Sequence, residues 1–353
     1  MLSAVLRLCA GISVAALAAC QTAPQPESIT LLGVPCASPP PQHCPDTACP
    51  GDLTSAPGNA TDPRNDDNRA YYLDYPCDLK PGEKVTFVLN LHGGGSIANW
   101  QRHYFPIMDF KEKYRLVVAT PYGPGGIWRG ERDDEHLHHI VQDVENALGR
   151  ENIKAFWLAG HSFGGQTSNR LINSDPFFQE RVDGWVSLSG GRLGSKREDI
   201  RAPIPRGTPP PPPATPPAGG AAPPAGPGGL AADASILPPK PFSFIYEAGE
   251  HEYTDAGVPK KSPWAAKLGC GSQNAPREVV DTKAGYVYDG RPQENRNSVW
   301  GLDPRPGKAL IWTYPGCTDG RVVADISRLD KGHTEGLEPN ITEEIIKLML
   351  SAS

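Results

Sequence analysis

The stretch WLAGHSFGG, residues 157–165, is a short apolar run that ends in a serine between glycines. A G-x-S-x-G pattern alone is weak evidence, because glycine is common enough for the pattern to arise by chance. Its surroundings strengthen it, since here the pattern follows an expected strand and opens an expected helix. In a nucleophile elbow such a serine stands on a tight, strained turn, and the glycines avoid clashes between a Cβ and neighbouring backbone. The stretch therefore predicts Ser162 as a nucleophile.

Other apolar runs of strand length lie on both sides of this stretch. They cover residues 85–95, 115–124, 155–160, 182–191, 242–250 and 322–329. Helical spacing appears at residues 135–149 and 166–173, and a last helix is expected to begin at Asn340, with Glu343 placed to complete a capping box. Short strands that alternate with helices predict an α/β fold, a mostly parallel sheet with helices on both faces.

Glycine-rich segments follow several of these expected strands. In open parallel sheets, functional groups collect in the loops at the carboxyl ends of strands. The segment LHGGG, residues 91–95, is expected there, and it offers an amide that can bind an oxyanion. Gly94 is the first choice for this donor and Gly95 the alternative. The amide of Phe163, at the start of the expected helix, supplies the second donor.

On this scaffold the acid and then the histidine follow the nucleophile along the chain. Two histidines follow Ser162, namely His251 and His333. His333 lies in DKGHTEG, residues 330–336, a glycine-containing loop between the last strand and the last helix, and is the predicted base. His251 lies too early, in the loop where the acid belongs. The carboxylates of that loop, in YEAGEHEYTD (residues 246–255), are Glu250, Glu252 and Asp255.

These motifs resemble the secreted α/β-hydrolases that include polyhydroxybutyrate depolymerases and feruloyl esterases. The resemblance runs from about Tyr71 to the C-terminus. It rests on LHGG, GHSFGG, WAAKLGC (residues 264–270), YPGC (residues 314–317) and KGHT. It implies the α/β-hydrolase fold, a single catalytic domain and a Ser-His-acid triad.

The resemblance also bears on single residues. Similar sequences read G-x-x-D after the strand that carries the acid, and counting from Gly249 gives Glu252, which makes Glu252 the leading acid although it is not an aspartate. The family usually has a small residue where Phe163 stands, so this side chain is expected to narrow the site. The cysteines of WAAKLGC and YPGC are commonly both present in the family, which implies a disulfide between Cys270 and Cys317.

The first twenty residues, MLSAVLRLCAGISVAALAAC, place Arg7 before an apolar stretch that is too short to span a bilayer as a stable helix. The stretch resembles the lipobox of bacterial lipoproteins, which implies lipidation of Cys20. A plain secretory signal is the alternative. Either signal would direct the protein out of the cytoplasm. The lipid would anchor it to a bacterial membrane, either the outer membrane or the membrane surface that faces the periplasm. The expected division is a signal peptide at 1–19, a tether and cysteine-rich extension at 20–68, and the catalytic domain at 69–353.

A proline-rich tract at residues 202–240 interrupts the alternation of strands and helices. It has no core-forming content and is expected to be a disordered insertion in the catalytic domain. The mature chain keeps an even number of cysteines, which favours three disulfides over a metal site in an oxidising compartment. The pairing of the first four stays open: Cys36, Cys44, Cys49 and Cys77.

Charge and motif content exclude several other classes of function. The net charge of −6 and the absence of a basic stripe argue against a nucleic-acid partner. Glu135, His136 and His139 fall on the expected helix at 135–149 but match no H-E-x-x-H pattern, so no metal site is predicted. The expected chemistry requires no organic cofactor.

The combined prediction is an extracytoplasmic serine carboxylic-ester hydrolase, similar to a feruloyl esterase or a polyhydroxyalkanoate depolymerase, with a polymeric or aromatic ester as substrate. Trp128 and His161 are expected to contact that substrate. Trp100, Trp264 and Trp300 are further candidates to line an aromatic cleft. Two alternatives remain: a peptidase or thioesterase on the same scaffold, or a non-catalytic surface binding protein with a hydrolase fold.

Overall fold

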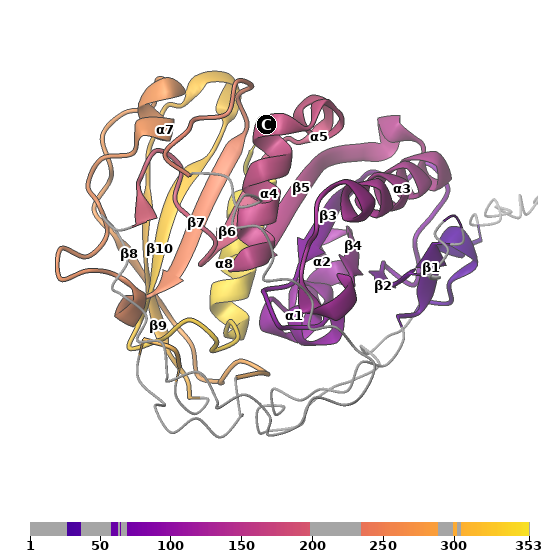
Figure 1. The fold of residues 1–353 in the computed structure, drawn as a ribbon, viewed down its shortest axis with the longest axis horizontal. Coiled ribbons are helices and arrows are strands. Elements are labelled where there is room, and N and C mark those ends of the chain that lie inside the picture. Colours follow the sequence, from indigo (N-terminus) through magenta and orange to yellow (C-terminus); the bar gives the residue numbers. More distant parts are fainter. Residues whose placement is uncertain are drawn as a thin grey trace, which may run out of the picture.

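The computed structural model describes residues 27–36, 58–62, 64, 69–197, 234–288, 299–301 and 305–352. These residues form one ten-stranded sheet in the order β1-β2-β4-β3-β5-β6-β7-β10-β9-β8 (Figure 1). The six strands from β4 to β10 in this order run parallel, and antiparallel pairs extend the sheet at both ends. The predicted mostly parallel sheet of the α/β-hydrolase fold is confirmed.

The strands are β1 Ala60–Asp62, β2 Arg69–Asp74, β3 Val85–Leu91, β4 Leu116–Pro121, β5 Ile153–His161, β6 Gly184–Leu188, β7 Ser243–Gly249, β8 Arg277–Val280, β9 Lys308–Thr313 and β10 Val323–Leu329. The helices are α1 Ala98–Tyr104, α2 Lys111–Tyr114, α3 Glu131–Leu148, α4 Phe163–Ser174, α5 Pro176–Arg181, α7 Pro263–Lys267 and α8 Pro339–Leu350. All six predicted strands are present. Strands β1, β2, β8 and β9 were not predicted from the sequence.

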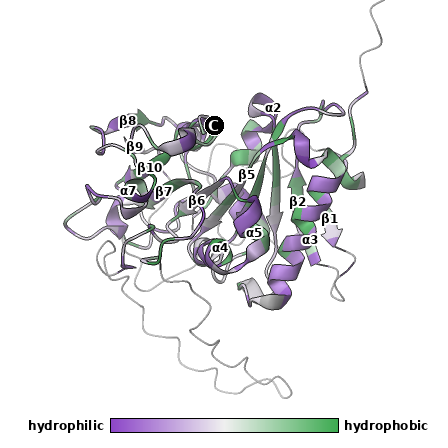
Figure 2. Ribbon diagram, turned by 90° about the horizontal axis from the view of Figure 1, so that it is seen from above, coloured by the Kyte–Doolittle hydropathy of each residue, from purple (hydrophilic) through white to green (hydrophobic). Residues whose placement is uncertain are grey.

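Side chains alternate between two cores because successive residues of a strand point to opposite faces of the sheet. In β5, Phe156 and Leu158 pack into the core under α3, α4 and α7, whereas Trp157 and Ala159 pack into the core under α1 and α8. The predicted covering of both faces is thereby confirmed. Figure 2 shows hydrophobic residues on the central strands and hydrophilic residues on the outer sides of the helices.

The predicted capping box at the last helix is wrong. Pro339 occupies the first helical position, where its missing N–H costs nothing, so α8 begins one residue before Asn340. The Asn340 side chain donates to the Val280 carbonyl at 2.8 Å. The Glu343 carboxylate accepts from the Tyr114 hydroxyl at 2.8 Å and also pairs with Lys113.

Part of the N-terminal extension packs on the domain. Leu31 and Val34 belong to the core on the α3 face, and a disulfide joins Cys36 to Cys77. β1 pairs with β2, and its Asp62 carboxylate contacts His139 Nδ1 at 2.8 Å and His136 Nδ1 at 3.2 Å. The two histidines considered as metal ligands therefore hold β1 against α3.

Several predictions fall on residues outside the described ranges. They concern the signal peptide, Cys20, Cys44, Cys49 and residues 202–233 of the proline-rich tract. β6 and β7, which flank that tract, pair directly in parallel, so the tract connects neighbouring strands of one sheet. None of the helices in the described ranges is long and apolar enough to cross a membrane.

Candidate active site

Ser162 lies at the turn from β5 into α4, with φ 50° and ψ −114°. A non-glycine residue in this region of backbone space is strained, and such strain gathers at functional sites. The turn is held from the next strand, because the Ser162 amide donates to the Leu188 carbonyl at 2.9 Å. The side chain is partly exposed, so a substrate can reach its hydroxyl.

The flanking glycines are required by close backbone contacts. A Cβ on Gly160 would lie 2.5 Å from the carbonyl carbon of Gly164. A Cβ on Gly164 would lie 2.4 Å from the Leu91 oxygen of β3, and one on Gly165 would lie 2.6 Å from the Gly190 Cα. The start of helix α4 therefore lies very close to the ends of β3 and β6. The sequence pattern predicts this close approach, because side chains larger than glycine would clash there.

Ser162, His333 and Glu252 form one hydrogen-bonded chain. His333 Nε2 lies 2.9 Å from Ser162 Oγ, and His333 Nδ1 lies 2.6 Å from Glu252 Oε2. The carboxylate favours the tautomer with a proton on Nδ1, which leaves Nε2 to accept from the serine hydroxyl. Glu252 ends a short 3₁₀ turn after β7 and His333 follows β10, and these two strands are parallel neighbours. The structure thus brings the three predicted residues together.

The structure separates the three carboxylates that the sequence left open. Glu252 is only 1% exposed and faces His333. Glu250 accepts from the Asp330 amide at the surface, and Asp255 is exposed three residues beyond the turn. His251 contacts the Asp330 carboxylate at 2.8 Å and so takes no part in the chain.

Two buried side chains hold the backbone of His333. The His161 ring nitrogen Nε2 lies 2.9 Å from the His333 carbonyl oxygen, and the Tyr104 hydroxyl donates to the same oxygen at 3.3 Å. The His161 ring packs 4.1 Å from the Tyr104 ring and 4.7 Å from the His333 ring. His161 therefore links the elbow to the loop that carries the base.

The loop that carries His333 is braced by buried charges. Glu335 Oε2 accepts from the Gly332 amide at 2.6 Å, and Lys331 pairs with Glu338 at 2.8 Å. Below them Arg328 pairs with Glu247, whose pKa burial raises while the guanidinium opposes the rise. Because these ions lie in the protein interior, removal of a single partner would leave a charge that is expensive to bury.

Phe163 and Gly94 carry the two candidate amides for an oxyanion hole. Phe163 opens α4, and the first amides of a helix have no carbonyl to bond within it. A Cβ on Gly94 would lie 3.5 Å from the Phe163 Cβ, which puts the two residues in direct proximity. The Gly95 amide already donates to the Gly126 carbonyl at 2.8 Å, so Gly94 is the better candidate of the two predicted glycines.

His92 supports the loop that carries Gly94. Its Nδ1 donates to the Gly93 carbonyl at 2.7 Å, and its Nε2 accepts from the Gly123 amide at 2.9 Å. Burial lowers the pKa of His92 to about 4, so the ring is neutral at pH 7. The neutral state is the one that these two bonds require, because a protonated ring cannot accept at Nε2.

Trp128 and His161, the residues expected to contact substrate, are both buried. Trp128 is 1% exposed, and its Nε1 donates to the His92 carbonyl at 2.9 Å. His161 is buried between aromatic rings as described above. Both side chains support the site from inside, His161 at the His333 carbonyl and Trp128 at the His92 carbonyl.

Of the other tryptophans, only Trp300 lies partly exposed beside the hydrogen-bonded chain of Ser162, His333 and Glu252. Its ring is 5.3 Å from the His333 ring, and its carbonyl accepts from the Thr334 amide at 2.8 Å. Trp100 and Trp264 are buried packing residues. Phe163 is partly buried and packs against the core on the α3 face, and its expected narrowing of the site stays a prediction.

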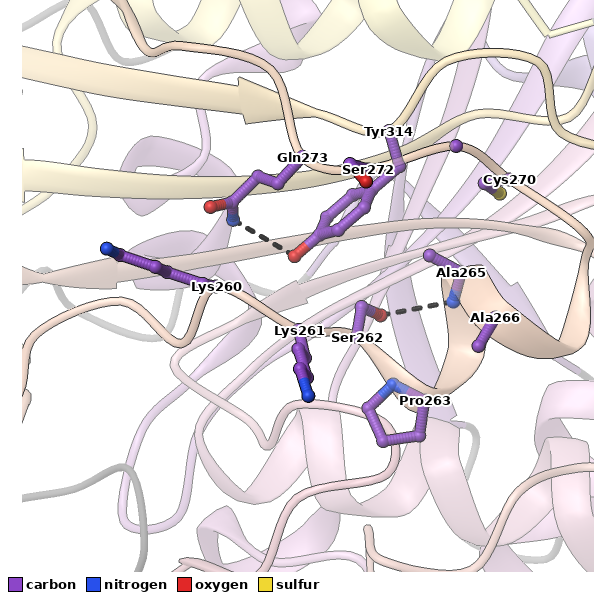
Figure 3. Close-up of a pocket in the computed structure, with 11 residues that line it drawn as sticks. Lys260, Lys261, Ser262, Pro263, Ala265, Ala266, Cys270, Ser272, Gln273 and Tyr314 are labelled. Carbon is purple, nitrogen blue, oxygen red and sulfur yellow. Dashed lines mark hydrogen bonds between the residues drawn. The ribbon is translucent and has the colours of Figure 1, made fainter.

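A cavity of about 360 Å³ lies apart from these hydrogen-bonded residues, beside α7 (Figure 3). The side chains of Lys260 and Lys261 extend outward from its lining, and the Gln273 amide bonds the Tyr314 hydroxyl. Next to it the structure joins Cys270 to Cys317, the pair that the family resemblance implies. None of Ser162, His333 and Glu252 lines this cavity, so it adds nothing to their chemistry.

Comparison with known proteins finds only solved structures of low sequence identity. No known protein family and no curated protein matches the sequence. An acetyl xylan esterase from Aspergillus awamori has a TM-score of 0.45 and 15% identity, over 83% of this chain and 98% of that one.

Two further solved structures are similar over smaller shares. A substrate-bound fluorophosphonate-binding serine hydrolase from Staphylococcus aureus gives a TM-score of 0.29 at 17% identity, over 36% of this chain and 52% of that one. A soluble variant of monoglyceride lipase from Saccharomyces cerevisiae gives 0.31 at 16%, over 42% and 48%. This chain thus spans about half the length of these two proteins.

Proposed function

We propose that this protein is a serine hydrolase of carboxylic esters. The observation that carries the proposal is the hydrogen-bonded chain from buried Glu252 through His333 to Ser162, which stands on a strained turn. A hydroxyl bonded to an imidazole, with the imidazole oriented by a carboxylate, is the arrangement that activates a serine for attack on an acyl group.

In the first half of the reaction, Ser162 Oγ attacks the ester carbonyl carbon while its proton passes to His333 Nε2. The amides of Phe163 and Gly94 stabilise the negative oxygen of the tetrahedral intermediate. Glu252 stabilises the imidazolium without taking its proton. The intermediate collapses, the carbon–oxygen bond to the alcohol breaks, and the alcohol leaves with the proton from His333.

In the second half, water attacks the acyl-serine ester. His333 takes a proton from the water, and the same two amides stabilise the second tetrahedral intermediate. Collapse breaks the bond to Ser162 Oγ, which receives the proton from His333, and the carboxylic acid departs. The cycle needs neither metal nor organic cofactor.

The proposal extends to substrate class and location. The motifs of the sequence favour an aromatic or polymeric ester, such as a feruloylated polysaccharide or a polyhydroxyalkanoate, and Trp300 is the aromatic side chain placed beside His333. The lipobox at residues 17–20 and the disulfides Cys36–Cys77 and Cys270–Cys317 support an extracytoplasmic lipoprotein. Membrane fractionation of wild type and Cys20→Ala tests the anchor, and a wild type that is already soluble would contradict it.

The catalytic proposal is tested with a fluorophosphonate probe and a panel of esters. Wild type is expected to take up the probe at Ser162 and to hydrolyse short-chain chromogenic esters. Ser162→Ala should remain folded, take up no probe and lose turnover by roughly 10³-fold or more. The matched control is Ser174→Ala, at the exposed end of α4, which should keep both activities.

The panel also includes feruloyl esters, a polyhydroxyalkanoate film, a thioester and a peptide. The preferred substrate among these distinguishes an esterase from a thioesterase or a peptidase on the same scaffold. If folded wild type takes up no probe and cleaves none of them, the proposal fails and a non-catalytic binding protein takes its place.

A further inference from the structure

The second oxygen of the Glu252 carboxylate is held by groups that no sequence motif indicates. Ser189 Oγ donates to Glu252 Oε1 at 2.6 Å, and the Gly249 amide donates to the same oxygen at 3.1 Å. The other oxygen, Oε2, faces His333 Nδ1. The carboxylate is therefore fixed from the side opposite the histidine.

Ser189 is fully buried, so a substrate in solution cannot contact it directly. It follows β6 directly, is 0% exposed, and its amide donates to the Glu247 carbonyl of β7 at 2.7 Å. Its φ is 54°, in the left-handed region that serine rarely occupies, although two glycines follow it in the chain. A side chain kept at a strained position, where glycine would relieve the strain, points to a function for its hydroxyl.

We propose that Ser189 is a positioning residue for the triad acid, an inference that rests on the proposed esterase function. A glutamate has one more rotatable bond than an aspartate, so its carboxylate must lose more conformational freedom to face a histidine. The short bond from Ser189 to Oε1 removes part of that freedom before the reaction. It also stabilises the charged carboxylate in a site that excludes water.

The experiment uses the full-length protein with Ser189→Ala and a matched control, Ser187→Ala. Ser187 lies in β6 two residues earlier, is equally buried and donates to the Gly191 carbonyl at 2.8 Å, without contact to the triad. Ser189→Ala is expected to lower kcat for a chromogenic ester roughly 10- to 100-fold while KM changes less than about twofold. Ser187→Ala should leave both constants near wild type.

A double-mutant cycle separates positioning from general damage. In a Glu252→Ala background there is no carboxylate to position, so adding Ser189→Ala should reduce kcat less than about twofold further. Ser189→Gly, which removes the hydroxyl and suits a positive φ, repeats the measurement if the alanine variant folds poorly.

The outcomes are distinct. A wild-type kcat for folded Ser189→Ala, or losses that multiply in the cycle, overturns the role of Ser189 while the esterase function stands. If wild type hydrolyses no ester, the proposed function itself fails.

Discussion

The two halves of the candidate site depend on different kinds of chemical group. The nucleophile half, formed by the ends of β3 and β5 and the start of α4, consists of backbone amides, glycines and a neutral buried histidine. The acid–base half, at the ends of β6, β7 and β10, is built around charged side chains: Glu252, to which Ser189 donates, and the pairs Arg328–Glu247 and Lys331–Glu338.

This difference shows which features of the sequence determine each half. Close packing of glycine backbone is a local property, so the pattern around Ser162 predicts it. The acid–base half depends on the register of β6, β7 and β10, which bring residues up to 81 positions apart into contact. Substitutions in the nucleophile half are therefore expected to act through steric clashes. Substitutions in the acid–base half should act through lost charges and hydrogen bonds.

The largest effect is expected in the acid–base half. Glu252→Gln should keep the fold and lower kcat roughly 10³-fold or more, because the amide favours the wrong tautomer of His333. Glu250→Gln is the matched control two residues away, with an exposed role toward the Asp330 amide, and should change kcat less than about twofold. Ester hydrolysis by both variants checks this, and a larger loss for Glu250→Gln would assign the acid to Glu250.

The same contrast explains what the sequence predicted. Ser162, Gly94 and the parallel sheet follow from local patterns and from apolar runs. Strand β8 escaped notice because only one of its four residues is buried, so it lacks an apolar run. Ser189 escaped notice because a serine after a strand has no distinctive pattern, and its partner Glu252 is 63 residues away.

A smaller effect is expected from a clash in the nucleophile half. Gly164→Ala places a Cβ 2.4 Å from the Leu91 oxygen and 2.5 Å from the His92 oxygen, so backbone must move. We expect the free energy of unfolding to fall by about 3 kcal/mol or more. At Gly82, which unlike Gly164 has a left-handed φ of 72°, a Cβ meets nothing within 4 Å, so Gly82→Ala should cost only about 1 kcal/mol of backbone strain. Equal losses by chemical denaturation would contradict the packing argument.

The last prediction concerns the neutral His92 beneath the oxyanion loop. Its pKa of about 4 in the folded protein lies below its ordinary value of 6.5, because burial disfavours the charged ring. Between these two pH values the unfolded chain binds a proton that the folded protein does not, so stability rises with pH and falls on acidification.

Lowering the pKa from 6.5 to about 4 corresponds to about 3 kcal/mol of unfolding free energy. The protein loses this stability as the pH falls from above 6.5 to 4, and none of it is lost at pH 8. His92→Gln, which cannot take up this proton, should be less stable than wild type at pH 8 because the bonds to Gly93 and Gly123 are disturbed. It should nevertheless lose about 3 kcal/mol less on acidification. Denaturant unfolding of both proteins from pH 8 to pH 4 measures the two slopes. Parallel curves would mean that the pKa of His92 is the same in the folded and unfolded states, and burial would then not keep the ring neutral on acidification.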